Sequence, residues 1–473
     1  MNRKTKIVAT LGPASDAPDV LSELLTAGVN VVRINFSHGA AEDHRQRVAA
    51  VRAAANALER PVAVLADLQG PKIRIESFVD GAVELECGQT FTLDTGLAAD
   101  AGTRERVAIH YPPLLADVRA GSELLVDDGA IALTVTDVDD RCIVCTVDAG
   151  GTLSGRKGVN LRGGGLSAGG LTDKDAEDLR LAAELEADYL AVSFVRSADD
   201  LEQARRMLTE AGGHARVCAK IERAEAITAL DDIITASDAV MVARGDLGVE
   251  IGDPELPAVQ KRIIARAREM NRLVITATQM MESMIEHPTP TRAEVLDVAN
   301  AALDGTDAVM LSAETAVGAY PVATVAAMSR ICVGAERQAT AERPISGLAA
   351  HFQRTDEAIA MAAMYTARHM HADAIIALTE SGTTAMLMSR QDTHIPIYAL
   401  TQYPRTERYL ALCRNVHPVA FAPSELNGVV PVDEAIACLK DRGQLHTGDR
   451  VLLTKGDFTG AGGTNALKIV GVD

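Results

Sequence analysis

The segment 273–314, LVITATQMMESMIEHPTPTRAEVLDVANAALDGTDAVMLSAE, contains a complete strand–helix–strand unit. Its two apolar runs, Leu273–Thr276 and Ala308–Leu311, are as apolar as strands buried on both faces of a parallel sheet. Between the runs, Thr291 and Glu294 have the spacing of a capping box that opens a helix, and a glycine follows the last helical turn. The segment therefore predicts a βαβ unit of a parallel sheet.

Similar apolar runs recur upstream, most of them separated by helical patterns. They are Ile7–Leu11, Val29–Ile34, Val62–Ala66, Tyr189–Val192, Arg216–Ala219 and Ala239–Val242. Together with the two runs above they make eight strand–helix units. Eight such units predict a closed (β/α)8 TIM barrel, in which the chemistry belongs at the carboxyl ends of the strands.

The barrel pattern is interrupted once and is followed by a second α/β pattern. From Gly70 to about Ala168, short Val/Thr/Leu stretches alternate with Gly, Asp and Pro, which predicts an inserted all-β module, a small β-barrel lid. The glycines of Gly163–Gly170 could form its hinge or serve only a turn. After about Arg337, strands such as Ala374–Leu378, Ile397–Leu400 and Val419–Phe421 alternate with helices, as in an open α/β sheet. We expect a catalytic barrel at 1–70 and 169–337, a lid at 71–168, and an effector-binding domain at 338–473.

Length and composition set the limits of function. A chain of 473 residues is too long for one core and suggests about three domains. The net charge of −19 argues against nonspecific binding to nucleic acid or to an anionic membrane. We found no apolar run that approaches the roughly 20 residues of a membrane span, and no signal-peptide pattern at the start. The expected location is the cytoplasm. Cys142 and Cys145 would face opposite sides of a strand, so we read the cysteines as structural.

Polar side chains follow the expected strands at six of the eight strand ends. Solvent contact alone could explain one or two such positions, but six predict a functional surface at one end of the cylinder. These residues are Arg33, Asn35, Ser37, Asp67, Lys220, Glu222, Arg244, Asp246, Thr278, Gln279, Ser312 and Glu314.

Two carboxylates and a lysine in this set suit phosphoryl transfer. Glu222 and Asp246 follow adjacent strands, and oxygen ligands of this kind suit Mg²⁺ held together with a substrate phosphate. Lys220 is two residues from Glu222 and therefore points to the same side of its strand. Arg33 adds a planar donor for phosphate oxygens, and Thr278 a hydroxyl that could pass a proton through water. An ordinary Lys220–Glu222 salt bridge is the alternative reading of that pair taken alone.

The blocks that carry these residues resemble the pyruvate kinase family. They occur in the order of the family, and the resemblance covers essentially the whole chain. The blocks are Val32-Arg33-Ile34-Asn35-Phe36-Ser37-His38-Gly39, Lys220-Ile221-Glu222, Ala243-Arg244-Gly245-Asp246-Leu247-Gly248, Thr276-Ala277-Thr278-Gln279-Met280-Met281-Glu282-Ser283-Met284 and Asp307-Ala308-Val309-Met310-Leu311-Ser312-Ala313-Glu314-Thr315.

The resemblance implies transfer of phosphate from phosphoenolpyruvate to ADP, which gives pyruvate and ATP. It implies that Glu222 and Asp246 hold Mg²⁺ or Mn²⁺ and that Lys220 stabilises the phosphoryl group in the transition state. Arg33 would bind the phosphate of phosphoenolpyruvate. Gly245, Asp246 and Thr278 would receive its carboxylate, and Thr278 would belong to the relay that protonates the enolate. The positions implied to contact the nucleotide are Asn35, His38, Arg74 and Lys157.

One departure from the family pattern concerns potassium. Many members need K⁺ and carry Asp-Thr-Lys-Gly-Pro-Glu after the third strand, whereas this chain has Asp67-Leu68-Gln69-Gly70-Pro71-Lys72. Lys72 would bring its own positive charge into the region of Asn35, Ser37 and Asp67, where the ion would bind. The hypothesis is that K⁺ is not required. The alternative is that Lys72 points to solvent and the ion still binds.

A second departure concerns regulation. Thr379-Glu380-Ser381-Gly382-Thr383-Thr384 joins a strand to a helix, and its hydroxyls could form a phosphate cradle or, equally, an N-cap turn without a ligand. Relatives switched by fructose 1,6-bisphosphate often carry lysine in place of Glu380. A carboxylate there would repel a second phosphate, which favours a monophosphate activator, either AMP or a sugar monophosphate. The resemblance also implies a homotetramer.

Two other functions fit parts of the pattern. A carbon–carbon lyase acting on a pyruvate enolate would keep the barrel and the metal, but it would have little use for ADP, Arg74, Lys157 or the lid. A non-catalytic metabolite sensor would keep only the C-terminal phosphate site, and the presence of Lys220, Glu222, Asp246 and Thr278 speaks against it.

Overall fold

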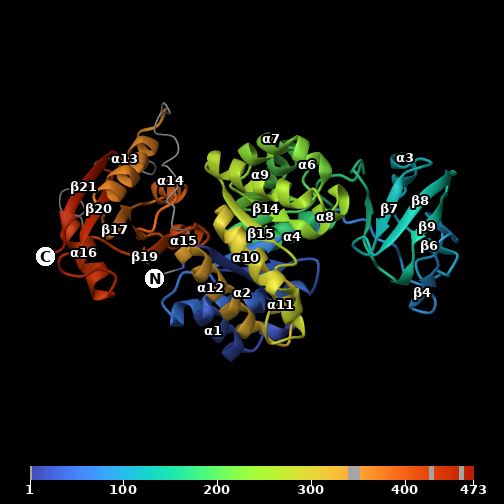
Figure 1. Ribbon diagram of the computed structural model, residues 1–473, viewed down its shortest axis with the longest axis horizontal. Helices are drawn as coiled ribbons and strands as arrows, with labels where there is room; N and C mark the ends of the chain where they lie inside the picture. Colours follow the sequence, from blue (N-terminus) through green and yellow to red (C-terminus); the bar gives the residue numbers. More distant parts are fainter. Residues whose placement is uncertain (1–2, 339–351, 425–430, 457–462) are drawn as a thin grey trace.

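The computed structural model describes residues 3–338, 352–424, 431–456 and 463–473. Within these residues the chain forms three parts arranged in a row, and the barrel lies between the other two (Figure 1). Among them, no helix is both long and apolar enough to cross a lipid bilayer.

The central part is a closed parallel barrel, as the sequence predicts. Around it the strand order is β1-β16-β15-β14-β13-β12-β3-β2. The bounds agree with the sequence-based runs to within two residues. They are β1 Lys6–Thr10, β2 Val31–Asn35, β3 Ala63–Asp67, β12 Tyr189–Val192, β13 Arg216–Ile221, β14 Ala239–Ala243, β15 Leu273–Ala277 and β16 Ala308–Leu311.

Helices cover the outside of the barrel. The capping box is confirmed, because Thr291 Oγ1 accepts from the backbone N–H of Glu294, and Gly305 ends that helix in a left-handed conformation. The helices of this part are α1 Pro18–Ala27, α2 Ala41–Ala57, α4 Asp173–Glu184, α5 Ala198–Glu210, α6 Ala224–Thr228, α7 Leu230–Ala236, α8 Arg244–Ile251, α9 Leu256–Glu269, α10 Arg292–Asp304, α11 Ala313–Ala316 and α12 Pro321–Gln338, with the 3-10 turns η1 Pro13–Ser15 and η2 Glu282–Ile285.

A module built almost entirely of strands is inserted between β3 and α4, where the sequence predicts an all-β one, and it also contains one short helix. Its described strands form a sheet of order β11-β7-β8-β9-β5-β6 and a β10-β4 pair, so it is more open than the expected small barrel. Its elements are β4 Ala82–Leu85, β5 Thr90–Asp94, β6 Arg106–Ala108, α3 Leu114–Asp117, β7 Glu123–Val126, β8 Ile131–Val138, β9 Cys142–Ala149, β10 Gly151–Ser154 and β11 Val159–Leu161. On β9, Cys145 is buried and Cys142 partly exposed, and all seven cysteines of the chain, each in a described range, are free.

The C-terminal part is an open α/β sheet of order β19-β18-β17-β20-β21 in the described residues. One expected strand was misplaced: β19 covers Val416–Ala420, not Val419–Phe421. Pro418 lies in the middle of this strand, and a proline in a sequence argues against a strand. The strand β19 tolerates it because it is at the edge of the sheet. The other elements are α13 Thr355–His369, β17 Ala374–Leu378, α14 Thr383–Ser389, β18 Ile397–Thr401, α15 Pro404–Leu410, α16 Val432–Asp441, β20 Arg450–Lys455 and β21 Ala466–Gly471.

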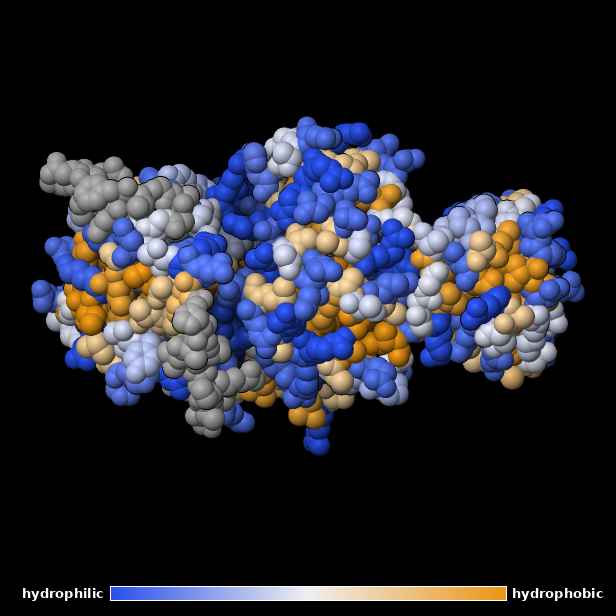
Figure 2. Space-filling model, turned by 90° about the horizontal axis from the view of Figure 1, so that it is seen from above, coloured by the Kyte–Doolittle hydropathy of each residue, from blue (hydrophilic) through white to orange (hydrophobic). Residues whose placement is uncertain are grey.

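The apolar cores are shared unequally between the three parts. Side chains inside the barrel, such as Leu65 and Ile275, belong to one cluster with Leu410 and Leu452 of the C-terminal part. The inserted module has a core of its own, built from residues between Ile73 and Ala168. Figure 2 shows the narrow neck through which this module joins the barrel.

Candidate active site

Polar side chains collect at the carboxyl ends of the barrel strands, at the end where the inserted module is attached. The structure adds the two strand ends that the sequence reading left empty. Thr10, the last residue of β1, accepts a hydrogen bond from Arg33 Nη1 at 3.1 Å. Ser193, directly after β12, accepts one from Lys220 Nζ at 2.6 Å. A lone Ser or Thr after a strand is too common to single out from sequence, so only the structure identifies these two.

Lys220 lies at the centre of this end. Its ammonium is 3.0 Å from Glu222 Oε1 and 3.3 Å from Asp67 Oδ1. The side chain is only 12% exposed, so these charges act on one another with little screening by water. Asp67 also accepts a 2.6 Å hydrogen bond from Arg33 Nε. The structure thus joins Arg33, Asp67, Lys220 and Glu222 into one ion network, which is more than an isolated salt bridge.

The electrostatics keep the lysine charged. Burial alone would lower the pKa of Lys220, but the carboxylates of Asp67 and Glu222 outweigh it and raise that pKa. Burial would raise the pKa of Asp67, and the charges of Lys220 and Arg33 hold it below its usual value. Lys220 is therefore an ammonium and Asp67 a carboxylate at neutral pH.

Glu222 and Asp246 have the properties of a carboxylate pair for a divalent cation. Burial, together with the negative charge of Asp246, raises the pKa of Glu222, although Lys220 opposes the shift. A cation between the two groups would relieve their repulsion. The described residues contain no group of three or more His, Cys, Asp or Glu side chains that could hold a metal. Two carboxylates completed by water and a substrate phosphate are the set that Mg²⁺ uses, so the residues present fit such an ion.

Thr278 begins a strained turn directly after β15. Its φ is +65° and that of Gln279 is +52°, a left-handed conformation that is rare for a β-branched residue. The Thr278 hydroxyl accepts from the backbone N–H of Gly245 at 2.8 Å and donates to the Ala277 carbonyl at 2.7 Å. The predicted neighbours Gly245 and Thr278 are therefore in direct contact. Strain of this kind is typical of functional sites, where the surrounding structure holds it.

Lys72 points into the site, but at a different partner from the one expected. Its ammonium is 2.8 Å from Asp246 Oδ1, and the side chain is 21% exposed. The expected neighbour Asp67 is already paired with Arg33 and Lys220. Asn35 and Ser37 interact with each other, because Asn35 Oδ1 accepts from the Ser37 N–H at 3.1 Å. Asp246 has no other ion pair among the described residues, which explains why Lys72 turns to it.

Comparisons with known proteins agree with this geometry. A family model for the pyruvate kinase barrel domain matches residues 2–325, and one for the pyruvate kinase alpha/beta domain matches residues 357–470. The chain belongs to the pyruvate kinase family. Pyruvate kinase II of Salmonella typhimurium is 53% identical over 476 residues, which cover 100% of this chain and 99% of that protein. A pyruvate kinase of Haemophilus influenzae is 50% identical over 475 residues, covering 100% and 99%. One of Mycobacterium tuberculosis is 46% identical over 413 residues, covering 87% and 86%. As a member of this family, the chain is a phosphate-transferring enzyme of glycolysis with a TIM barrel.

The nucleotide residues expected of a pyruvate kinase are divided between two parts of the chain. Asn35 ends β2 at the barrel mouth, and the exposed His38 follows it. Arg74 and Lys157 belong to the inserted module. Arg74 donates to the Arg156 carbonyl, and Lys157 pairs with Asp127 at 2.7 Å. The structure shows no contact between the two pairs, so a nucleotide that touches both must lie between the module and the barrel.

The candidate effector loop joins β17 to α14. Its hydroxyls bond within the loop: Thr379 Oγ1 accepts from the Gly382 N–H at 2.8 Å, and the Ser381 and Thr383 hydroxyls are 2.9 Å apart. Thr384 Oγ1 lies 2.7 Å from Thr464 Oγ1, and Glu380 is exposed.

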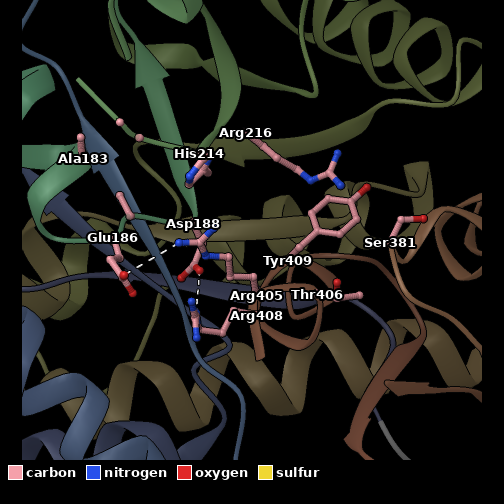
Figure 3. Close-up of a pocket in the computed structure, with 13 residues that line it drawn as sticks. Ala183, Glu186, Asp188, His214, Arg216, Ser381, Arg405, Thr406, Arg408 and Tyr409 are labelled. Carbon is pink, nitrogen blue, oxygen red and sulfur yellow. Dashed lines mark hydrogen bonds and ion pairs between the residues drawn. The ribbon is translucent and has the colours of Figure 1, made fainter. Parts of the chain in front are cut away.

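A cavity of about 240 Å³ opens beside this loop, between the barrel and the C-terminal part (Figure 3). Ser381 lines it together with Arg216, Arg405 and Arg408, all labelled in the figure. Each of these arginines is paired with a carboxylate: Arg216 with Asp238 at 3.6 Å, Arg405 with Glu186 at 3.8 Å and Arg408 with Asp188 at 2.7 Å.

Proposed function

We propose that this enzyme transfers the phosphoryl group of phosphoenolpyruvate to ADP and that Lys220 is its central catalytic group. One observation carries the proposal: a buried ammonium is held by two carboxylates and a serine hydroxyl at the mouth of the barrel. A fixed positive charge in a poorly solvated site stabilises the charge on a transferring phosphoryl group far better than one in water.

Each remaining residue has a part in the reaction. The bond between phosphorus and the enol oxygen breaks, and a β-phosphate oxygen of ADP forms the new bond. Arg33, fixed by Asp67 and Thr10, binds the phosphate of the substrate. The backbone at Gly245 and Asp246, with Thr278, receives the substrate carboxylate, and the Gly245 N–H would exchange its bond to Thr278 Oγ1 for the substrate. The enolate left behind takes a proton at its methylene carbon through a relay that includes the Thr278 hydroxyl.

Glu222 and Asp246 would hold the divalent ion, Mg²⁺ or Mn²⁺. When bound there, such an ion neutralises and orients the phosphate oxygens. The two carboxylates are suited to this because Glu222 is buried and fixed, with Oε2 accepting from the Phe194 N–H at 2.8 Å, while Asp246 is partly exposed.

Formation of ATP from phosphoenolpyruvate and ADP tests the function. We expect pyruvate and ATP in equal amounts, with a strict need for a divalent metal. A lyase would release a carbon–carbon cleavage product without using ADP. A sensor would show no turnover in the presence of AMP or of a panel of sugar phosphates.

We further propose that residues 71–168 close over the barrel mouth as a lid and bring Arg74 and Lys157 to the nucleotide. Support comes from the separate core of the module and from the glycines at its return to the barrel. Gly163, Gly164 and Gly165 all have positive φ. Backbone amides of residues 71–168 should exchange their hydrogens more slowly when ADP and Mg²⁺ are added together. Unchanged exchange would contradict closure.

K⁺ is proposed not to be required. The ammonium of Lys72 already supplies a positive charge next to the carboxylates of the site, and it points to Asp246 and not to solvent. The assay compares potassium with tetramethylammonium salts. We expect equal turnover, and a large activation by K⁺ would refute the idea.

The effector is proposed to be a monophosphate, AMP or a sugar monophosphate, bound at Thr379–Thr384. Glu380 disfavours a second phosphate, and Arg405, which is exposed and only loosely paired with Glu186 at 3.8 Å in the adjoining cavity, can turn to one. Activation by fructose 1,6-bisphosphate but by no monophosphate would contradict this. Family membership also supports a homotetramer and a cytoplasmic location, which sedimentation and cell fractionation can test.

A further inference from the structure

The side chain of Arg244 crosses from one barrel strand to the turn that follows the next. Arg244 opens α8 directly after β14, and its side chain is only 8% exposed. Its Nε is 3.2 Å from the Ala277 carbonyl oxygen and 3.1 Å from that of Thr278. Its Nη2 is 2.6 Å from the Thr278 oxygen and 3.1 Å from that of Gln279. One guanidinium therefore binds three successive carbonyls of the turn that carries Thr278.

This turn needs such a restraint. Thr278 and Gln279 both have positive φ, a conformation that persists at residues other than glycine only where the surroundings enforce it. Carbonyls that point into a buried region must also find donors. Arg244 supplies these donors in the fixed planar geometry that only a guanidinium has.

The far side of the guanidinium is anchored. Nη1 donates to Asp297 Oδ1 at 2.8 Å on α10 and contacts Gln260 Oε1 at 3.4 Å on α9. The group is thus fixed by two helices on one side and by the turn on the other. The residue after Arg244 completes the link, because the Gly245 N–H donates to Thr278 Oγ1.

We propose that Arg244 is a positioning residue that sets the place and direction of the Thr278 hydroxyl for protonation of the enolate. The proposal rests on the proposed role of Thr278 in that relay. Arg244 does not touch the reacting atoms. Its loss should therefore slow proton transfer to carbon and leave the binding of ADP unchanged.

The experiment measures proton transfer by itself, as exchange of the pyruvate methyl protons in D₂O followed by ¹H NMR with Mg²⁺ and ATP. Arg244→Lys keeps the charge beside Asp297, but an ammonium cannot bind three carbonyls in one plane. We expect exchange and kcat to fall by about 10²-fold, the loss typical of a group misplaced by about 1 Å, with KM for ADP unchanged. Thermal melting should show that the variant is folded. Arg244→Met, compared at the same temperature, should lose at least as much.

A double-mutant cycle separates positioning from independent action. If Arg244 works through Thr278, the variant Arg244→Lys/Thr278→Ala should exchange no more slowly than Thr278→Ala alone. Effects that multiply would overturn the inference, as would wild-type exchange in Arg244→Lys. If exchange is slow in Thr278→Ala but normal in Arg244→Lys, the positioning role of Arg244 would fail while the role of Thr278 in the relay would stand. Wild-type exchange in Thr278→Ala would show that Thr278 is not in the relay, and both assignments would fail.

Discussion

The inserted module and the C-terminal part are attached to opposite ends of the barrel in different ways. The module has its own apolar core and meets the barrel through polar contacts, such as Lys72 with Asp246 and the Gly163 N–H with the Glu250 carbonyl. The C-terminal part shares an apolar core with the barrel interior. Polar contacts that water can replace allow the module to move, whereas the shared core requires the C-terminal part to move with the barrel.

The buried charged groups also differ between the two ends of the barrel. Below the barrel, Asp307 forms a two-pronged ion pair with Arg390 of the C-terminal part and accepts from the Arg414 N–H. Every one of those groups is satisfied within the protein. At the mouth, Asp67 Oδ1 has only its 3.3 Å ion pair with Lys220 among the described residues, and burial raises the pKa of Glu222. Charges at the mouth are arranged for a ligand, and those below the barrel for cohesion.

The largest effect that can test this difference is expected at the mouth. Lys220→Met should lower turnover by on the order of 10³-fold or more, because it removes the cation that stabilises the transition state. Stability should fall as well, because the buried carboxylates of Asp67 and Glu222 lose the ammonium that they share. Turnover and thermal melting measure the two effects.

Lys261→Met on α9 is the matched control, since Lys261 is largely exposed and its one ion pair among the described residues is with Asp304. It should keep wild-type turnover. Near-normal activity in Lys220→Met would overturn the assignment of the whole site.

Below the barrel, a loss of stability is expected without a loss of turnover. Arg390→Met should leave the Asp307 charge buried without its main partner and lower the free energy of unfolding by about 3 kcal/mol. Urea denaturation measures the loss. Turnover with saturating substrates should stay close to wild type, because no group at the mouth is touched.

Arg45→Met is a suitable comparison, because Arg45 pairs with Glu184 at the surface, where water screens the charges. Its denaturation curve should overlay that of the unaltered enzyme. If Arg390→Met lowers the free energy of unfolding no more than Arg45→Met does, the ion pair below the barrel does not stabilise the fold.

The sequence predicts those features of the fold and of the site that depend on the periodicity of strands and helices. The strand period placed Lys220 and Glu222 on one side of β13, and closure of the barrel brought Arg33 and Asp67 to the same end. Partner choice was not foreseeable. Lys72 turns to Asp246 because other cations neutralise Asp67, which depends on three strands at once.

The hydrogen bonds from Arg244 to the carbonyls of the Thr278 turn could not be predicted from the sequence either. It requires left-handed backbone angles at Thr278 and Gln279 that no pattern of apolar residues reveals.

A smaller effect tests the contact that joins the module to the mouth. Lys72→Glu replaces the cation by the carboxylate usual in K⁺-dependent relatives, which creates a site for a monovalent ion. We expect turnover in tetramethylammonium to fall by about tenfold and K⁺ to restore it, because the added negative charge must be neutralised. Lys72→Met should lose activity without recovery by K⁺. Equal rates of Lys72→Glu in the two salts would show that Lys72 does not stand in for the ion.

The smallest effect is expected at Glu250 on α8, where the module returns to the barrel. Burial raises the pKa of Glu250 to about 7, although its hydrogen bond from the Ala224 N–H and the charge of Arg223 oppose the shift. The folded protein therefore holds a proton that the unfolded chain has already released. This contribution to stability is complete below the ordinary pKa of a glutamate and is lost as the pH rises through 7.

Glu250→Gln is neutral at every pH and can still accept from Ala224, so its melting temperature should exceed that of the unaltered enzyme by roughly 2 °C at pH 8 and match it at pH 4.5. The exposed Glu255→Gln should show no such dependence on pH. A constant difference between Glu250→Gln and the unaltered enzyme across this range would mean that Glu250 is ionised throughout. The base of the module would then be held by a fixed charge and would not respond to protons.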